Sequence, residues 1–137
     1  MNKLIPAVLM FAVSMPASAS FTGSDLLGQC QKFVDIIEGG KTDLQHTLQA
    51  GLCGGYVLGV QDGFLASSEL ALIASEDQGT PPVSGKYWDI PEDVEDETLV
   101  RIVVKYLELN PDMQSKPAIL SVINALIQTY PVKKSGE

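Results

Sequence analysis

Two cysteines and one histidine are the side chains of this sequence best suited to chemistry. Cys30 and Cys53 are the only cysteines, and His46 is the only histidine. A catalytic thiol needs a stable thiolate beside a base, and a zinc site needs closely spaced ligands such as C-x-x-C, which are missing here. An even number of cysteines in an oxidising compartment favours a disulfide instead. We predict a Cys30–Cys53 bond that closes a loop of about 24 residues.

Acidic side chains offer a second possible chemistry. Asp62 and Glu69 are seven residues apart, so they would share one face of a helix. Two carboxyl groups can carry acid–base catalysis when their pKa values differ, but solvent-facing acids at this spacing are also common. The sequence has no G-x-S-x-G motif, no phosphate-binding glycine loop and no calcium-loop pattern. We therefore predict no enzymatic activity, no metal and no cofactor, and we expect binding to be the function.

An acidic run follows the only tryptophan, Trp88. One interpretation is structural, because acids suit the first turn of a helix, with Glu95 as the cap between apolar Val94 and Leu99. The other interpretation is a surface that recognises a basic partner. Trp88 is open to two roles as well, a lid over the core or an anchor for a partner. The acids of the run are Glu92, Asp93, Glu95, Asp96 and Glu97.

The first 19 residues resemble an export signal. Lys3 precedes an apolar run from Leu4 to Val13, and Ala17-Ser18-Ala19 is a small-residue cleavage site. We predict cleavage after Ala19, which leaves a single domain over residues 20–137 with no membrane span. Removing the leader removes one lysine and no acid, so the formal charge falls from −8 to −9. Such a charge disfavours nucleic acid and anionic lipid and favours a basic protein partner, although it also simply aids solubility.

Helical periodicity organises the elements that would position these residues. The pattern predicts an all-α fold, a compact bundle of four main helices with one disulfide between the first two. That bond would hold the first two helices together as an antiparallel hairpin. Two prolines and two glycines predict a loop over residues 76–85. The helices are expected from the N-cap Ser24 to Gly39, from about Asp43 to Ala66, from the cap Glu95 to Leu109, and from near Ser115–Pro117 to Tyr130. Residues Ser67 to Leu72 would either extend or cap the second helix.

The second predicted helix is unusually rich in glycine. Each glycine costs up to about 1 kcal/mol relative to alanine in a helix interior, so some compensation is needed. Close approach to another helix is one explanation, and a bend near Gly54-Gly55 is the other. The glycines are Gly51, Gly54, Gly55, Gly59 and Gly63.

Together these features resemble a known family. The leader and Cys30 are followed by the segment CGGYVLGVQD over residues 53–62, which is similar to a C-x-G-Y-[IV]-x-G-[IV]-x-D pattern. Ile90-Pro91, Asn110-Pro111 and Tyr130-Pro131 follow in matching order. In this pattern the chain resembles the Rap/Tai immunity proteins, small periplasmic helical proteins that neutralise peptidoglycan amidases delivered by type VI secretion.

The resemblance implies a periplasmic homodimer that binds a cognate peptidoglycan amidase effector and plugs its active-site groove. We expect recognition to lie in the segment from Glu76 to Glu97, because aromatic anchors dominate many interfaces and acids steer a basic partner. An alternative function is a periplasmic chaperone of the acid-stress type, which loosens as its carboxylates become protonated. The residues that we expect at the partner interface are Tyr87, Trp88, Asp89, Glu92, Asp93, Glu95 and Asp96.

The sequence departs from the family pattern at a second cysteine pair. Many members have one cysteine before Ile-Pro and one after the final proline, where this chain has Asp89 and Val132. The segment around Trp88 therefore lacks a covalent link to the C-terminus. We predict that packing of Trp88 replaces that link.

Overall fold

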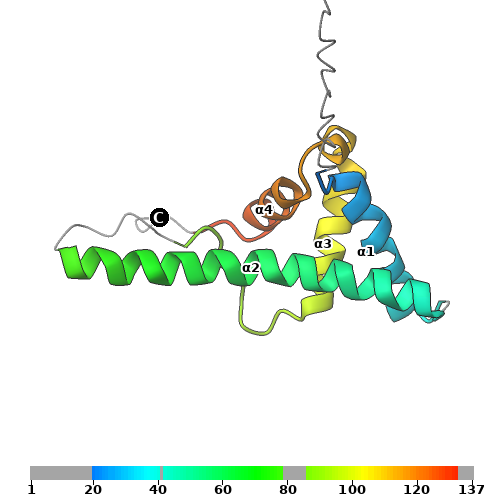
Figure 1. The fold of residues 1–137 in the computed structure, drawn as a ribbon, viewed down its shortest axis with the longest axis horizontal. Coiled ribbons are helices and arrows are strands. Elements are labelled where there is room, and N and C mark those ends of the chain that lie inside the picture. The colour runs from blue at the N-terminus through cyan, green and yellow to red at the C-terminus, as the bar shows by residue number, and fades with distance from the viewer. Residues whose placement is uncertain (1–19, 41, 79–85, 133–137) are drawn as a thin grey trace, which may run out of the picture.

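The computed structural model describes residues 20–40, 42–78 and 86–132, and within α2 it describes side chains up to Ser75. The described chain is an all-α bundle, as predicted, and it contains no strand beyond one isolated bridge between Thr22 and Pro117. The predicted leader, residues 1–19, lies outside the described residues, as do residues 79–85 of the expected loop. The elements are α1 (Gly23–Ile37), α2 (Leu44–Gln78), α3 (Asp96–Leu109), the 3-10 turn η1 (Pro111–Ser115) and α4 (Ala118–Thr129) (Figure 1).

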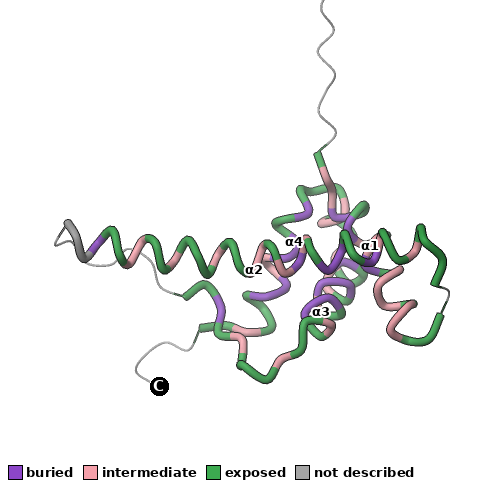
Figure 2. Tube along the Cα trace, turned by 60° about the horizontal axis from the view of Figure 1, so that its bottom comes forward, coloured by how far each residue is buried: buried purple, intermediate pink, exposed green. Residues whose placement is uncertain are grey.

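The core forms where α1, α3 and α4 meet the first half of α2. Figure 2 shows that buried segments gather there, whereas the second half of α2 extends away with mostly exposed residues. Burial of aliphatic side chains is the main source of stability in such a core. The largest fully buried side chains include Leu26, Leu99, Leu107, Leu126, Val57 and Val122.

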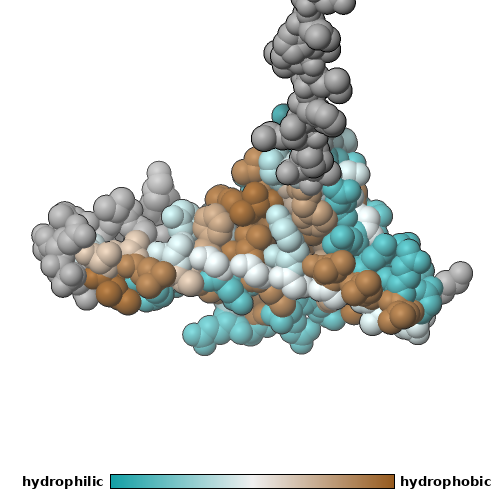
Figure 3. All heavy atoms as spheres, viewed as in Figure 1, coloured by the Kyte–Doolittle hydropathy of each residue, from teal (hydrophilic) through white to brown (hydrophobic). Residues whose placement is uncertain are grey.

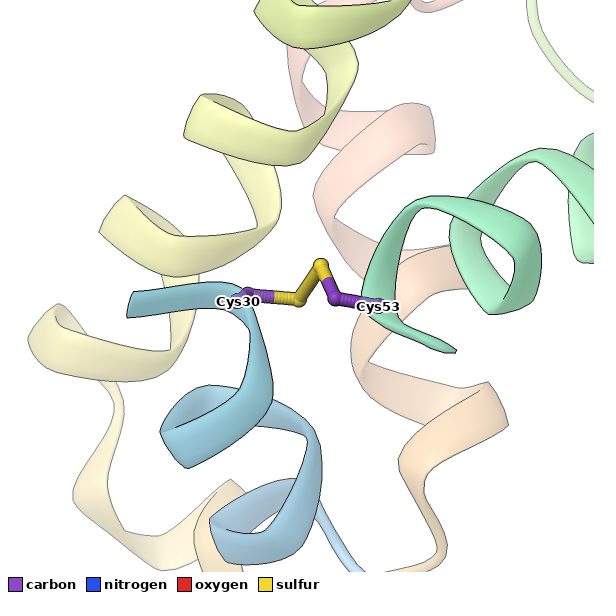
Figure 4. Close-up of a disulfide and its surroundings, with 2 residues drawn as sticks. All are labelled: Cys30 and Cys53. Atoms are coloured by element: carbon purple, nitrogen blue, oxygen red, sulfur yellow. A yellow bond between two sulfur atoms is a disulfide. The ribbon is translucent and has the colours of Figure 1, made fainter. Parts of the chain in front are cut away.

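The predicted disulfide joins α1 to α2. Cys30 and Cys53 are both fully buried, and their Cα atoms lie 5.0 Å apart. Figure 4 shows the bond spanning the space between the two helices, with α3 and α4 around it. Consecutive helices α1 and α2 thus form a linked pair, although Figure 1 shows that they cross obliquely. The bond fixes the part of α2 that belongs to the core.

Helix α1 begins two residues earlier than the sequence suggested. The cap is Thr22 and not Ser24, because Thr22 and Asp25 form a reciprocal capping box. The Asp25 carboxylate accepts hydrogen bonds from the Thr22 amide at 2.9 Å and the Thr22 hydroxyl at 2.7 Å. These bonds lower the pKa of Asp25. The predicted end at Gly39-Gly40 is correct, since Gly39 adopts the positive φ of 84° that suits a glycine after a helix.

Helix α2 is longer than predicted. It spans 35 residues, about 52 Å at 1.5 Å per residue. Of the two expectations for Ser67 to Leu72, extension of the helix is therefore correct, whereas the expected start of the loop at Glu76 is wrong. The helix continues through Gly54 and Gly55 without a sharp bend (Figure 1), so the bend considered as the alternative explanation for the glycines is absent. Close packing within the chain explains one glycine only: a Cβ on Gly54 would lie 3.4 Å from the Phe33 ring.

Residues Leu44–Ser75 of α2 are long and apolar enough to cross a membrane, judged by length and composition alone. The first half of this stretch, however, packs into the core through Cys53 and Val57. The part beyond Phe64 spans only about 21 Å, whereas the hydrocarbon core of a bilayer is about 30 Å thick. In this fold, therefore, α2 is not free to serve as a membrane span.

Candidate functional site

The segment before α3 lies against α2 through aromatic contacts. Trp88 is only 4% exposed, and its ring centroid lies 5.3 Å from that of Phe64 on α2. Tyr87 packs edge-on against the same Phe64 ring at 5.0 Å but remains 46% exposed. The position of Trp88 favours the first role considered for it, a lid over the core. Of the two neighbouring rings, Tyr87 is the one that a partner can reach.

A backbone hydrogen bond links this segment to the end of α4. The Asp89 amide donates to the Tyr130 carbonyl at 2.9 Å, close to the positions where the family pattern has its second cysteine pair. The Asp89 carboxylate also forms an ion pair with Lys86 at 3.2 Å, between two exposed side chains. The segment is thus connected to the C-terminal part of the chain without a covalent bond.

The four acids expected in the interface after Asp89 all lie at the surface. Glu92, Asp93, Glu95 and Asp96 are all exposed. The structural interpretation also holds, because Glu95 is the N-cap of α3 and Asp96 lies in its first turn, where the helix dipole favours negative charge. Glu95 caps with its backbone alone, since its side chain makes no capping hydrogen bond. The carboxylates therefore suit the helix start and remain available to a partner.

A hollow of about 200 Å³ is lined by Asp89, Glu92 and Asp96 together with residues of α2. Its lining includes Gln61, whose buried Oε1 atom has no hydrogen-bond partner among the residues that the structure describes. Gln61 and Lys86 belong to this surface, although neither was among the residues predicted to form it. Lys86 reaches Asp89 locally, as an i,i+3 ion pair. Gln61 joins the hollow only because α2 packs against this segment, and no local pattern in the sequence indicates that contact. The lining residues are Gln61, Leu65, Lys86, Trp88, Asp89, Ile90, Pro91, Glu92, Val94, Asp96 and Leu99.

The residues considered for catalysis are not brought together in the structure. His46 caps the start of α2 together with Asp43: its amide and its Nδ1 atom both contact the Asp43 carboxylate, at 2.9 and 2.8 Å. These hydrogen bonds lower the pKa of Asp43, the backbone bond most strongly. Asp62 and Glu69 are both exposed on α2. Over the described residues, no group of three or more histidine, cysteine, aspartate or glutamate side chains is placed to hold a metal ion.

Comparison with known proteins identifies the family. A family model described as Rap1a immunity proteins matches residues 22–132, a range that contains all four helices, the disulfide and the acidic segment. No curated protein and no solved structure shows a significant match to the chain. Because the family match covers most of the sequence, the chain belongs to the Rap1a immunity protein family.

Proposed function

We propose that this protein is a periplasmic immunity protein that binds a type VI secreted peptidoglycan amidase and blocks its active-site groove. The observation that carries the proposal is the family match over residues 22–132. A buried disulfide and a leader-like N-terminus both suit an oxidising compartment outside the cytosol. We further propose that the protein acts as a homodimer, as the family resemblance implies.

The surface proposed to meet the amidase consists of Tyr87 and the acids that follow it. Tyr87 offers a half-exposed ring held in place by Phe64, and a preorganised aromatic side chain loses little entropy on binding. Four exposed acids beside it attract a basic groove and accelerate encounter. Trp88 supports this surface from below, because its buried ring fixes the backbone on which Tyr87 and Asp89 sit.

The electrostatic part of the proposal is tested with the acids of the run changed to amides. The variant combines Glu92→Gln, Asp93→Asn, Glu95→Gln, Asp96→Asn and Glu97→Gln, and its association rate with the purified amidase is measured by stopped flow. At low salt we expect a fall of roughly tenfold, which shrinks as added salt screens the charges. The control changes the exposed acids Asp35, Glu108 and Asp112 in the same way, on other parts of the surface.

The contact part of the proposal is tested with Tyr87→Ala. We expect dissociation from the amidase to accelerate by at least about tenfold, because removing an aromatic anchor typically weakens binding by 1–2 kcal/mol or more. The enzyme's hydrolysis of peptidoglycan is measured in parallel. If the wild-type protein neither binds an amidase encoded by a neighbouring gene nor reduces its activity, the proposal is wrong.

A chaperone function predicts a different outcome. An acid-stress chaperone would bind a hydrophobic dye and protect client proteins at about pH 2–3, where expanded states form. Protection of clients in acid without any inhibition of an amidase would favour that alternative.

A further inference from the structure

Helix α2 exposes an apolar face that no part of the described chain covers. Large aliphatic side chains on this face are strongly exposed, with Leu44 at 86%, Leu48 at 62%, Leu70 at 66% and Ile73 at 62%. Figure 3 shows apolar atoms gathered near both ends of α2, with a paler stretch between them. We call this surface the outer face, and it consists of Leu44, Leu48, Gly51, Leu52, Gly55, Gly59, Gly63, Ala66, Leu70 and Ile73.

Glycines occupy the centre of the outer face. Gly51, Gly55, Gly59 and Gly63 recur every four residues, and a Cβ added to any of them would meet nothing within 4 Å. Together they cost α2 roughly 3–4 kcal/mol of helix propensity, and no residue that the structure describes packs closely enough on them to offset that cost. Three of them line an open groove of about 550 Å³ whose walls are mostly apolar. Glycines in such a row allow another helix to approach α2 closely.

The order of residues on the outer face is nearly symmetric about Val57. Gly55 and Gly59 lie at equal distances on either side of it, as do Gly51 and Gly63. Farther out, Leu44 corresponds to Leu70 and Leu48 to Ala66. A two-fold contact needs a self-complementary patch, because each residue of one copy meets its counterpart on the other. We propose that a second copy of this chain docks antiparallel on the outer face, with the two helices crossing closest between Gly55 and Gly59.

The positions of the acids favour the antiparallel direction. Among the described side chains, up to Ser75, the acids on this side of α2 are Asp62 and Glu69, and both are exposed. In the antiparallel register Asp62 lies level with Leu52 of the other copy, so the two Asp62 carboxylates are about 15 Å apart along the helix axis. A parallel pair would place these two negative charges side by side. Glu69 lies level with Gln45 by the same geometry, so like charges are kept apart along the helix.

The available area suits a stable dimer. From Leu44 to Ile73 the outer face is about 44 Å long, and a helix with its side chains is about 10 Å across. Contact along this strip buries on the order of 500 Å² per copy or more, which reaches the total of about 1,000 Å² expected of a biological interface. A helix pair crossing at a small angle keeps such contact over its length. This inference rests on the homodimer of the proposed function and adds the surface and direction of contact.

Single-cysteine cross-linking tests the register. The variants are Gly55→Cys, Leu48→Cys and Leu70→Cys in the mature protein with its disulfide intact, treated with a short bismaleimide. The antiparallel register separates the two copies of residue 55 by about 6 Å along the axis, of residue 48 by about 27 Å and of residue 70 by about 39 Å. We expect a cross-linked dimer from Gly55→Cys only. Cross-linking at all three sites would indicate a parallel pair, and cross-linking at none would place any dimer elsewhere; either result overturns the proposal.

Bulky substitution tests the close approach. Gly55→Leu/Gly59→Leu meets open space in the single chain and raises helix propensity, so the monomer should fold. We expect its dimer dissociation constant, measured by sedimentation equilibrium, to rise at least tenfold. The matched control is Gly28→Leu, an equally open glycine on α1, which should dimerise like the wild type. An unchanged dissociation constant contradicts the proposal, as does a wild-type protein that stays monomeric at 100 times the concentration used for binding assays. Co-sedimentation of the wild-type protein with neutral lipid vesicles, in place of dimerisation, also contradicts it.

Inhibition of the amidase is measured on the same variants to separate the two proposals. A wild-type dimer with the predicted cross-links but no inhibition would leave the interface standing and remove the proposed function. Full inhibition by a protein that lacks the α2 contact would do the reverse.

Discussion

At the scale of single residues, Trp88 does most to connect the acidic segment with the body of the protein. Its ring is buried against Phe64, and the neighbouring Asp89 amide bonds to Tyr130. These two contacts lie where a family pattern with four cysteines would have a covalent link. Burial of a large aromatic ring stabilises a fold by several kcal/mol, which is comparable to a disulfide. A noncovalent link of this kind can therefore hold the segment in place.

Replacing Trp88 with alanine tests this role. We expect the free energy of unfolding to fall by about 3–5 kcal/mol, since the ring is lost and a cavity remains. Thermal unfolding followed by circular dichroism gives the measurement. Tyr87→Ala is the control because its ring is half exposed, and its effect should stay below about 1.5 kcal/mol. An unchanged melting temperature for Trp88→Ala would show that Trp88 does not replace the missing link.

The capping box at the start of α1 makes a pH-dependent contribution to stability. Hydrogen bonds from Thr22 lower the pKa of Asp25 below its ordinary value of 3.8. A group whose pKa is lower in the folded state stabilises the protein above the unfolded pKa, and this contribution is lost as the pH falls through the folded pKa. We expect Asp25→Ala to lower the melting temperature at pH 7 and to have little effect near about pH 2. Asp35→Ala, an exposed acid on the same helix, is the control for charge alone; a difference that persisted in acid would contradict the capping account.

At the scale of elements, helical periodicity predicts α1, α3 and α4 well because each has one apolar stripe against the core. It leaves the end of α2 undecided, because Ser67 and Ser68 could either cap the helix or continue it. In the structure their hydroxyls donate to the Phe64 and Leu65 carbonyls, at 2.8 Å each, so they stay within the helix. Apolar residues lie on both faces of α2, and periodicity alone therefore gives no boundary.

The candidate site illustrates a second limit of the sequence. Its acids, Tyr87 and Trp88 are recognisable because they form a short local run. Gln61 is not, because it joins the surface only where α2 packs against the segment. Contacts between residues distant in sequence depend on how whole helices pack, and short patterns carry little information about that packing.

The disulfide links α1 covalently to α2 and should stabilise their packing. On the chain-entropy account, closing a loop of about 24 residues stabilises the fold by roughly 3–4 kcal/mol. We expect Cys30→Ala/Cys53→Ala to lose about that amount, plus a smaller loss from packing, because both sulfurs are fully buried. Urea unfolding of oxidised, reduced and double-alanine proteins gives the comparison. If reduction left the midpoint unchanged, the bond would not contribute to holding α1 on α2.

At the scale of the whole molecule, the protein has two candidate contact surfaces that differ in chemical character. The acidic segment is charged and lies next to the half-exposed ring of Tyr87 in the sequence. A charged surface of this kind suits reversible recognition of a basic partner. The outer face of α2 is apolar and long, which suits a persistent contact. The second half of α2 extends beyond the body (Figure 2), and an isolated helix of this length is marginally stable in water. Covering the outer face with a second copy would stabilise that extension as well.

This coupling between assembly and folding predicts a melting temperature that depends on concentration. When only the folded chain dimerises, mass action stabilises it as the protein concentration rises above the dimer dissociation constant. We expect the wild-type melting temperature to rise by several degrees over a hundredfold increase in concentration, since a few kcal/mol shift a domain of this size by about that much. Differential scanning calorimetry of the wild type, Gly55→Leu/Gly59→Leu and Gly28→Leu provides the measurement. The first variant should melt at one temperature throughout, whereas Gly28→Leu should follow the wild type; a wild-type melting temperature that ignores concentration would mean that the extension of α2 is stable without a second copy.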